Sequence, residues 1–296
     1  MNANHQRGAL KGAQFVKIAG PFGDWVVFFE PSDNIEIENN VTILCNRSRG
    51  IGASGVVVVR PAQQNLTGIA PCYRVDAWNA EGQPITNMTE PARVATFVLA
   101  VLKKIPTSET SHHVFETQFE PVTTVFTPSF VGVDIGKWAY TDPDTAVAAG
   151  SDVFVMAENL TDPRPGLSIQ IRNTHVIVAV ESFSELAAID LNEPPSTEPP
   201  THTGASTSIN FVVPHDPLMS AGMGQAQLRT YMDASHGHEL ATAAAGAAVA
   251  LQTWTGLQQL NIWNIGTEQG DVVVQIHDKH RLSTFARLTV AFFGTL

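Results

Sequence analysis

The chain has 296 residues, of which 44% are hydrophobic, and a formal net charge of −11 with only 17 Lys and Arg. This length supports one large or two ordinary domains. The scarcity of cations excludes a polyanion such as nucleic acid as the main partner, because phosphate binding requires clustered positive charge. The longest apolar run beside a predicted helix, residues 94–102, is far shorter than the roughly 20 residues that a membrane-spanning helix requires. The composition therefore predicts a soluble protein with no membrane partner.

The N-terminal segment MNANHQRGALKG is polar and lacks the apolar stretch of a secretion signal. We therefore expect residues 1–14 to form a disordered tail and the protein to be cytoplasmic. The first predicted strand begins directly after this segment, at Phe15.

Short runs rich in β-branched and aromatic residues, which are typical of strands, recur along the chain. In chain order they are residues 15–18, 25–29, 41–44, 55–59, 73–78, 124–127, 130–135, 152–157, 167–171, 175–180, 209–213, 228–232, 271–276 and 288–293. Two segments predict buried helices instead, residues 91–104 and the alanine-rich residues 239–257. Residues 192–204, rich in proline and threonine, predict an exposed loop. The pattern indicates a β-rich chain with two central helices.

The two helical segments stand at similar places in the two halves of the chain. Arg74 begins a predicted strand, and Met88 follows 14 residues later at the start of the first helix. Arg229 begins another strand, and Ala243 follows 14 residues later in the second helix. Together with the similar order of strands, this spacing suggests two related lobes, each with a sheet around one helix. We expect both helix N-termini to face a cleft between the lobes, where their dipoles would favour a carboxylate ligand.

The cysteines, Cys45 and Cys72, are too few for a disulfide scaffold or a zinc cage. Cys45 lies in the apolar run VTILC, which predicts a buried, inert thiol. No phosphate-binding loop, Ser-His-Asp order or metal-spaced set of His, Asp and Glu competes elsewhere. The adjacent His112 and His113 would point to opposite faces of a strand. We therefore expect neither a metal nor a cofactor.

Several longer stretches carry a resemblance to one enzyme family. FVKIAGPFGDWVV, residues 15–27, resembles F-x-K-M-H-G-x-G-N-D-F, and LCNRSRGIGASGVVVV, residues 44–59, resembles L-C-D-R-x-x-G-I-G-A-D-G. YRVDAWNAEGQPITNMTEPAR, residues 73–93, resembles R-I-F-N-A-D-G-S-E-x-E-M-C-G-N-G-A-R. In the second half IRNTH, TSINFVV and HELATAAAGAAVA resemble G-N-P-H, T-N-V-x-F and G-E-T-L-A-C-G-T-G-A. Across nearly its whole length the chain therefore resembles diaminopimelate epimerase and its relatives.

The resemblance implies an α+β fold of two pseudo-symmetric β-rich lobes, each a curved or barrel-like sheet around a central helix. It implies an N-terminal lobe made of residues 15–130 with residues 285–296, and a C-terminal lobe of residues 131–284. The last predicted strand, residues 288–293, would then return to the first lobe.

In that family one cysteine stands at the N-terminus of each central helix, and the two act on opposite faces of one carbon, where one removes a proton and the other returns one. Here the matching positions are Met88 and Ala243. A thioether has no proton to give and a methyl group has no acid-base chemistry, so inversion by two cysteines is excluded. Further family positions are replaced by Gly23, Thr89, Glu90, Pro91, Ala244 and Ala245.

Other substrate-binding positions of the family are kept. Asn79, Asn173 and Asn210 match asparagines whose amides line the family's substrate pocket. An asparagine in a turn otherwise caps its own backbone, and this alternative applies most to Asn79. His175 either donates a hydrogen bond to the ligand or caps its strand. Thr89, at the start of the first helix, completes the expected substrate-binding residues.

If the chain is an enzyme, the group that transfers the proton must come from elsewhere. His236 and His238 lie just before the second helix, whose N-terminal potential favours neutral imidazole, the form that accepts a proton. An exposed polar turn is the alternative interpretation of this segment. Glu239 follows in the first helical turn, where negative charge is favourable. Glu90 is the remaining candidate; a helix N-terminus stabilises its carboxylate, so it fits better as an electrostatic or hydrogen-bonding group.

The resemblance also implies a function that needs no thiols. The phenazine-biosynthesis isomerase has the same implied fold without the cysteines and moves a proton along an allylic system. Epimerase-like isomerases of alkylproline antibiotic pathways shift a double bond in an unsaturated amino acid. We therefore expect a cofactor-independent isomerase that performs an allylic shift on a small unsaturated, amino-acid-like intermediate of a natural-product pathway. An epimerase or racemase with bases other than cysteine, and an inactive homologue with a binding role, are the alternatives.

The expected partner is thus a small carboxylate or amino-acid-like molecule. One base can carry a proton between two carbons on the same face, so an allylic shift tolerates the loss of the thiol pair. A homodimer stays open as the oligomeric state.

Overall fold

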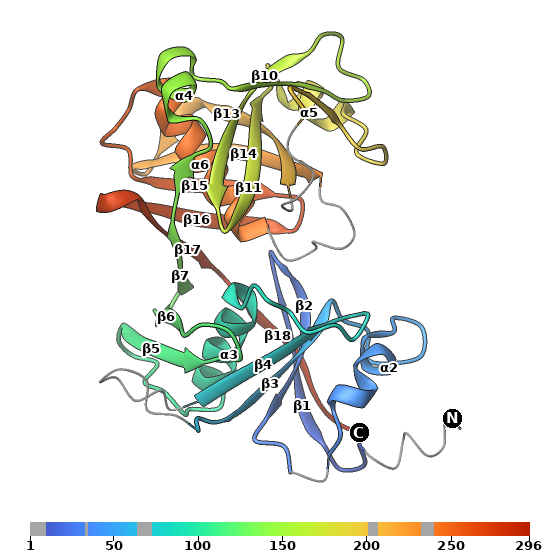
Figure 1. Cartoon of the computed structure of the whole chain (residues 1–296). Helices are drawn as coiled ribbons and strands as arrows, with labels where there is room; N and C mark the ends of the chain where they lie inside the picture. Colours follow the sequence, from blue (N-terminus) through green and yellow to red (C-terminus); the bar gives the residue numbers. More distant parts are fainter. Residues whose placement is uncertain (1–9, 33–34, 64–72, 201–206, 232–239) are drawn as a thin grey trace. The chain divides into compact units, whose positions relative to one another are not determined.

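A computed structural model describes residues 10–32, 35–63, 73–200, 207–231 and 240–296 of the chain. The chain divides into two compact units (Figure 1). The first unit contains the described residues up to Asp134 together with Ala286–Leu296, and the second unit is Ile135–Phe285.

The first unit is built on one mixed sheet. Its strands are β1 (Gln14–Gly20), β2 (Gly23–Phe29), β3 (Gly55–Pro61), β4 (Tyr73–Asn79), β5 (Ser111–Glu116), β6 (Val122–Phe126), β7 (Val131–Lys137) and β18 (Thr289–Thr295). They pair in the order β18, β1, β2, β3, β4, β5, β6, β7, and the β2–β3 and β4–β5 pairs are parallel. A parallel pair requires a crossover connection. The first crossover contains η1 (Glu38–Asn40) and α2 (Val41–Cys45), and the second contains α3 (Thr89–Val101).

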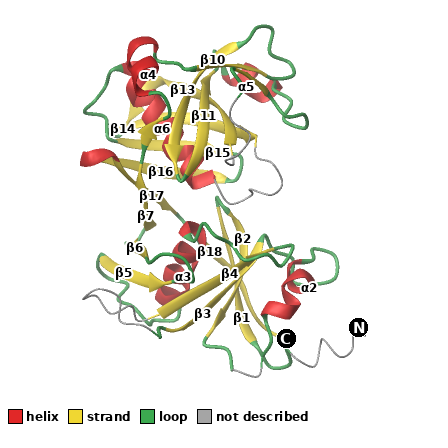
Figure 2. Ribbon diagram, viewed as in Figure 1, coloured by secondary structure: helices red, strands yellow, loops and turns green. Residues whose placement is uncertain are grey.

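An apolar row crosses this sheet and packs against α3. Val16, Val27, Val57 and Ala77 stand directly opposite one another in successive strands, so their side chains share one face. All four are buried in one cluster with apolar residues of α3. Burying a valine stabilises a fold by roughly 1.5–3 kcal/mol, so this row is a main determinant of where α3 lies. Figure 2 shows α3 in red against the yellow strands.

Residues 41–44 form the start of helix α2 and not the expected strand. Val41, Leu44 and Cys45 are buried whereas Thr42 and Ile43 are exposed, which is the three-to-four-residue spacing of a helix. The β-branched residues favoured a strand locally, but packing against the sheet determines the conformation. The expected burial of Cys45 is confirmed, and burial raises the pKa of its thiol to about 11.

The second unit repeats this plan. Its strands are β8 (Ala139–Tyr140), β9 (Val153–Met156), β10 (Arg164–Ile171), β11 (Asn173–Ala179), β12 (Ser196–Glu198), β13 (Thr207–Ser220), β14 (Met223–Tyr231), β15 (Ile262–Thr267), β16 (Gly270–His277) and β17 (Arg281–Ala286). Its helices are α4 (Pro143–Ala149), α5 (Phe183–Ala188), α6 (Leu240–Thr255) and the short η3 (Asp278–His280).

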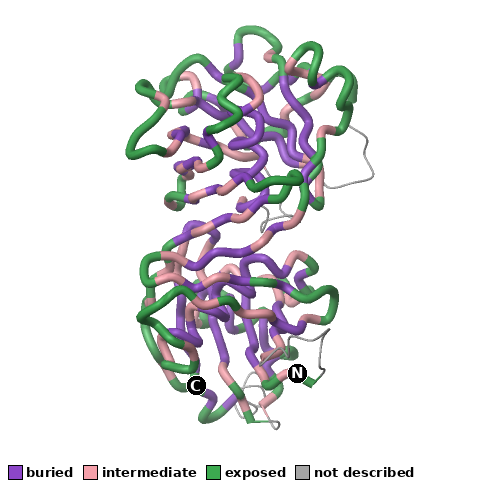
Figure 3. The backbone as a smooth tube through the Cα atoms, turned by 90° about the vertical axis from the view of Figure 1, so that its left-hand side faces the viewer, coloured by how far each residue is buried: buried purple, intermediate pink, exposed green. Residues whose placement is uncertain are grey.

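The two units share one order of pairings, which confirms the expected pseudo-symmetric fold. In the first unit β1 and β2 are antiparallel, β2 and β3 parallel, β3 and β4 antiparallel, and α3 leads to β5, parallel to β4. In the second unit β10, β11, β13, β14, α6 and β15 follow the same sequence of antiparallel and parallel pairs. Both central helices are buried on nearly all sides, as expected of helices enclosed by a sheet. The buried backbone in Figure 3 follows the strands and central helices of each unit.

Several local expectations differ from the structure. Helix α3 begins at Thr89, two residues before the expected start at Pro91, and ends at Val101. Leu10 and Ala13, within the segment expected to be a tail, are buried, and the Gly12 N–H donates to the Leu296 carbonyl at 2.7 Å. The proline-rich segment contains β12, which pairs with β9.

Candidate functional site

Asn79 ends strand β4 and closes the turn that follows it. Its Oδ1 accepts from the Gln83 N–H at 2.8 Å, and its backbone N–H donates to the Gln83 carbonyl at 2.9 Å. Asn79 therefore caps this turn, and its expected substrate-binding role stays a proposal.

The N-terminus of α3 carries Met88 and Thr89, which differ in character. Met88 is the N-cap residue and 1% exposed, and its thioether belongs to the apolar cluster of the first unit. Thr89 is also 1% exposed, and its Oγ1 has no hydrogen-bond partner among the described residues. The position that matches the family's first cysteine is thus part of the core, and a buried, unpaired hydroxyl follows it.

Glu90 and Arg93 form a buried ion pair within the first turn of α3. The Arg93 Nε donates to Glu90 Oε2 at 2.9 Å and Nη2 donates to Oε1 at 3.2 Å. Arg93 Nη1 also donates to the Val131 carbonyl at 2.5 Å, and the guanidinium lies 4.9 Å from the Phe22 ring centre. This geometry occupies both carboxylate oxygens of Glu90.

Burial raises the pKa of Glu90, and the Arg93 charge only partly offsets that effect. The direction is opposite to the one expected from the helix N-terminus. A helix terminus contributes about 0.3–1 kcal/mol at the surface, whereas removing a carboxylate from water costs several kcal/mol. The sequence places Glu90 at the helix start but does not show how deeply it is buried.

In the second unit His175, Ser208 and Asn210 form a buried polar group, named here the His175 cluster. His175 of β11 stands directly opposite Ser208 of the parallel strand β13, and Asn210 lies two residues further along, on the same face. His175 and Asn210 are fully buried and Ser208 is 2% exposed. The alternation of strand residues therefore brings three polar side chains together inside an apolar unit.

Hydrogen bonds within the His175 cluster leave two polar atoms unpaired. His175 Nδ1 lies 2.7 Å from Ser208 Oγ, and Asn210 Nδ2 donates to the same oxygen at 2.9 Å. Asn210 Nδ2 also lies 3.3 Å from the Val176 and Ser208 carbonyls. Among the described residues His175 Nε2 and Asn210 Oδ1 have no partner. Buried polar atoms are normally paired, so this donor–acceptor combination is suited to a ligand or a water molecule.

Burial lowers the pKa of His175 to about 4, and a hydrogen bond with the Ile171 backbone opposes this shift. The imidazole is therefore neutral at physiological pH. When Ser208 accepts from Asn210 and donates to His175 Nδ1, the ring proton resides on Nε2, which becomes a donor. His175 thus suits hydrogen bonding to a ligand better than it suits proton abstraction, because its conjugate acid is too strong for an efficient base at neutral pH.

Helix α6 passes directly over the His175 cluster. A side chain added at Gly246 would place its Cβ 3.3 Å from His175 Cβ and 3.2 Å from Ile177 Cδ1. Ala243, which matches the family's second cysteine, lies one turn earlier on the same helix face and is fully buried. The second cysteine position is therefore a methyl group beside a polar cluster.

Asn173 is the first residue of β11 and is half-buried, two residues before His175 and on the same strand face. His236, His238 and Glu239 lie outside the described residues, so their expected roles remain proposals. Sequence reasoning missed Ser208 and Arg93. Ser208 could have been found from the two-residue alternation with Asn210, and Arg93 from its spacing of three residues after Glu90.

Within the described ranges no group of three His, Cys, Asp or Glu side chains is placed to hold a metal ion. No helix in that part of the chain is long and apolar enough to span a bilayer.

No protein-family model matches the chain. Solved structures match it over nearly its whole length at low identity. A phenazine biosynthesis protein of the PhzF family from Bacillus anthracis matches with a TM-score of 0.65 and 10% identity, covering 97% of this chain and 99% of that one. A hydroxyproline epimerase from Agrobacterium vitis, with bound trans-4-hydroxy-L-proline, gives a TM-score of 0.60 and 10% identity, with coverage of 97% and 92%.

A methylitaconate-delta-isomerase matches with a TM-score of 0.52 and 10% identity over 96% of this chain and 95% of that one. The chain therefore has the two-lobed diaminopimelate epimerase-like fold, as the sequence motifs predicted. Identities near 10% establish the fold alone.

Proposed function

We propose that this protein is an isomerase that moves a proton within a small carboxylate or amino-acid-like substrate without using cysteine thiols or a cofactor. One observation carries the proposal. Both family cysteine positions are buried apolar residues, Met88 and Ala243, whereas the His175 cluster keeps buried polar atoms that lack partners. The ligand-binding part of the site is thus retained while the two-thiol chemistry is lost.

The reaction that fits this pattern is an allylic shift of a double bond. One base removes a proton from a carbon beside the double bond, the electron pair moves along the three-carbon system, and the same base returns the proton to the far carbon. The substrate gains and loses no atoms. Because a single base on one face suffices, the reaction tolerates Met88 and Ala243.

Two of the similar structures support the substrate class. One holds trans-4-hydroxy-L-proline and another is named for the isomerisation of methylitaconate, so this fold accommodates a cyclic amino acid in one case and an unsaturated acid in the other. An unsaturated amino-acid-like intermediate combines these chemistries. An alkylproline unit of an antibiotic pathway is the proposed source of such a substrate.

In this proposal Asn173, His175 and Asn210 bind the polar groups of the substrate. Neutral His175 donates from Nε2 to a carboxylate oxygen, and Asn210 Oδ1 accepts from an ammonium or imino N–H. His236 or His238 is the proposed base, with Glu239 as a neighbouring charge. Glu90 is a weaker candidate, because both of its oxygens are engaged by Arg93. Thr89 Oγ1, buried and unpaired among the described residues, is a further proposed ligand contact.

A binding protein without catalysis is the second candidate. The same observation favours it, since Met88 and Ala243 are core residues that need no chemistry. An epimerase with bases other than cysteine requires acid-base groups on both faces of one carbon.

Proton exchange in deuterated water separates the three functions. The purified protein is incubated with a panel of unsaturated cyclic amino acids, and deuterium uptake is followed by NMR and mass spectrometry. An isomerase exchanges a proton at the carbon that ends the allylic system and keeps the configuration of the α-carbon. Exchange at the α-carbon with inversion would instead identify an epimerase, and binding without exchange would identify a binding protein.

Variants then test the named residues. Replacing the true base, by His236→Gln or His238→Gln, is expected to lower turnover by about 10²–10⁴ with substrate affinity nearly unchanged. Asn210→Ala is expected to weaken binding instead, because it leaves a polar substrate group unpaired. If both histidine variants turn over at the wild-type rate, the base lies elsewhere and Glu90→Gln becomes the decisive variant.

A further inference from the structure

A polar pocket of about 410 Å³ lies in the second unit at the C-terminal end of helix α6. Its lining comes from the region of β8, the last turns of α6, the loop that follows α6, and the segment that joins β16 to β17. Gly246, which faces the His175 cluster, precedes Gln252 and Thr253 of this lining by six and seven residues, so the two places lie about 9–10 Å apart along the helix axis. The pocket is therefore separate from the candidate site, and its volume is in the usual range for small-molecule sites.

Three aromatic rings form a continuous surface in this pocket. The Trp138 and His280 rings stack with their centres 4.5 Å apart at an interplanar angle of 16°, and the Tyr140 ring meets Trp138 edge-on at 5.1 Å. The Trp138 backbone N–H also donates to the His280 carbonyl at 2.9 Å, which joins the two chain segments. Ile276, which is 8% exposed, adds an apolar side chain. Aromatic rings offer a large, rigid contact surface for the apolar parts of a ligand.

Two buried side chains of the pocket keep polar atoms without a protein partner. Trp138 is 9% exposed, and its Nε1–H has no acceptor among the described residues. Gln252 is 7% exposed, and its Nε2 donates to the Gln258 carbonyl at 3.3 Å and to the Leu260 carbonyl at 3.0 Å. These two bonds fix the amide, and in the described part of the chain no donor reaches its Oε1, which stays available as an acceptor. Buried polar atoms are normally paired, so the pocket is suited to a ligand that supplies both an acceptor and a donor.

The Tyr140 hydroxyl adds a further acceptor. Thr253 Oγ1 donates to the Val249 carbonyl at 2.8 Å, so the 2.8 Å contact between Tyr140 Oη and Thr253 Oγ1 uses the tyrosine proton. The lone pairs of Tyr140 Oη therefore remain open. Four exposed side chains of the lining show no hydrogen bond or ion pair within the described ranges, and these are Gln258, Asn261, Asp278 and Lys279.

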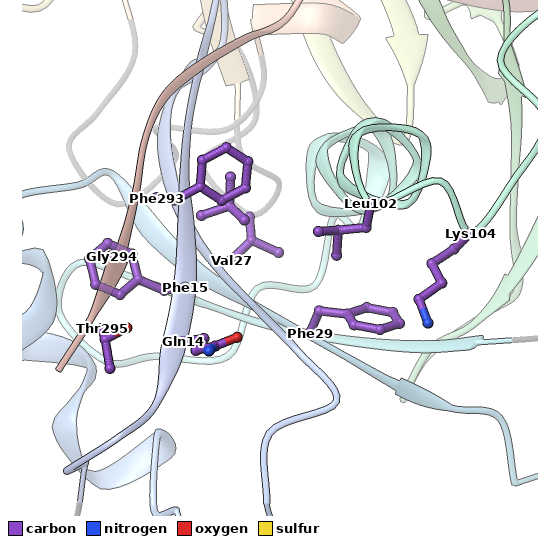
Figure 4. A pocket seen from close by; sticks show the side chains of 10 residues that line it. Gln14, Phe15, Val27, Phe29, Leu102, Lys104, Phe293, Gly294 and Thr295 are labelled. Atoms are coloured by element: carbon purple, nitrogen blue, oxygen red, sulfur yellow. The ribbon is translucent and has the colours of Figure 1, made fainter.

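The first unit contains a groove of a different character. It measures about 530 Å³ and is lined mainly by apolar side chains, among them Val27, Phe29, Leu102 and Phe293 (Figure 4). A ligand rich in hydroxyl groups would lose hydrogen bonds to water against such a surface, at about 1–3 kcal/mol for each group left unpaired. Of these two places, the pocket at the end of α6 is the one suited to a hydroxylated ligand.

We propose that the pocket at the end of α6 binds a saccharide, with one sugar ring against the aromatic surface of Trp138. Each hydroxyl group of a sugar is both a donor and an acceptor, which matches a lining that offers the Trp138 N–H together with the Gln252 and Tyr140 oxygens. The C–H groups of the sugar ring pack on the aromatic surface. The exposed amides of Gln258 and Asn261 bind the outer hydroxyl groups.

An uncharged ligand fits this pocket better than an ion does. Asp278 and Lys279 carry opposite formal charges, which cancel. A phosphate would be repelled by Asp278 and a polyamine by Lys279, whereas sugar hydroxyl groups form hydrogen bonds with both. The inference is independent of the proposed function, because it uses neither the His175 cluster nor the N-terminus of α3.

Indole NMR signals test the site directly. The chain has 5 tryptophans, so the ¹⁵N-labelled full-length protein gives one indole N–H signal for each, and Trp138→Phe identifies the signal of Trp138. D-glucose, D-galactose, D-mannose, N-acetyl-D-glucosamine and maltose are titrated in turn, with inorganic phosphate and L-phenylalanine as charged probes. We expect at least one saccharide to shift the Trp138 signal saturably, with a dissociation constant of about 1 mM or lower. The proposal is overturned if no saccharide shifts this signal, or if only a charged probe does.

Neighbouring glutamines provide a matched pair of variants. Gln258→Ala removes an amide of the pocket lining and is expected to raise the saccharide dissociation constant by about 2–10-fold, which corresponds to one hydrogen bond. Gln259→Ala removes the same side chain at the next position, which is also exposed but is not part of the lining, and should leave the dissociation constant unchanged. Equal effects of the two variants would show that the saccharide binds elsewhere, as would unchanged binding to the double variant Gln258→Ala/Asn261→Ala.

Discussion

Glu90 and Arg93 sit in one helical turn and form a buried ion pair. Replacing one partner of a buried pair leaves an uncompensated charge, which costs about 3–5 kcal/mol. Arg93→Met is therefore expected to lower the free energy of unfolding by about that amount, measured by urea denaturation.

The control for this prediction is Glu181→Gln, because Glu181 is the 76% exposed partner of Arg164. Exposed pairs contribute about 0–1 kcal/mol, so this variant should be nearly neutral. The double variant Glu90→Gln/Arg93→Met should recover part of the loss, since it removes both charges. If Arg93→Met lowers the free energy of unfolding no more than Glu181→Gln does, the ion pair of Glu90 and Arg93 does not stabilise the first unit.

His175 predicts a pH dependence of stability. Its pKa falls on folding from 6.5 to about 4, so between these values the unfolded chain binds a proton that the folded chain does not. The free energy of unfolding is therefore not reduced by His175 above pH 6.5. It falls by about 3 kcal/mol as the pH drops from 6.5 toward 4. Glu90, whose pKa is raised by burial, acts with the opposite sign. The prediction therefore concerns the difference in the free energy of unfolding between the wild type and His175→Gln.

The measurement is urea denaturation of both proteins at several pH values from 7 to 4. The stability difference between wild type and His175→Gln should shrink as the pH falls through this window. His215→Gln, at an exposed histidine, is the control variant. A difference that stays constant with pH would mean that His175 is not held neutral.

At the scale of elements, α6 depends on Gly246 to lie close to β11. A Cβ at this position would stand 3.2–3.3 Å from the side chains of Ile177 and His175, which is tight but short of a clash. Alanine gains about 1 kcal/mol of helix propensity over glycine, so Gly246→Ala is expected to be nearly neutral. Gly246→Val adds two methyl groups at the tightest point and should destabilise the fold by about 1–3 kcal/mol.

This pair of variants also tests the His175 cluster, because crowding at Gly246 pushes against His175. In thermal unfolding the valine variant should melt below the alanine variant, and its ligand affinity should be weaker. Equal melting temperatures would show that α6 moves away from β11 at little cost.

The elements that the sequence predicted are those with strong apolar runs. β3, with the run VVVV, is buried on both faces, and α6 is rich in alanine, so each has one dominant interpretation. β15 and β17 were missed because IWNIGT and RLSTFA mix apolar residues with Asn, Ser or Thr. In α2 the β-branched residues gave the wrong local preference, and packing decided otherwise.

Only part of the candidate site could be predicted, because sequence motifs show which residues match the family and do not show how far those residues are buried. The matched residues His175 and Asn210 do lie together, since β11 and β13 are neighbours. Ser208, which joins them, carries no motif signal. The ion pair of Glu90 and the low pKa of His175 depend on burial, which the sequence does not reveal.

For the whole molecule, the first unit is closed by the last strand of the chain. β18 pairs with β1 and covers Phe15 and Val16, which are 7% and 5% exposed. A chain that ends after Arg287 would expose this edge of the core. We expect such a truncation to lower the melting temperature of the first unit and leave the second unit folded, as followed by hydrogen exchange. If the truncation reduced the protection of backbone amides from hydrogen exchange equally in both units, β18 would not act on the first unit alone.

The first unit is also discontinuous, because Ile135–Phe285 lies between its two parts. A ribosome makes the chain from the N-terminus, so every residue of the second unit has been synthesised before β18 exists. The second unit can complete its sheet first, whereas β1 keeps one open edge until β18 has been made. Domains usually fold in the order in which they are made, and here that order is reversed. During synthesis, the nascent first unit is the part of this chain that most needs protection from aggregation.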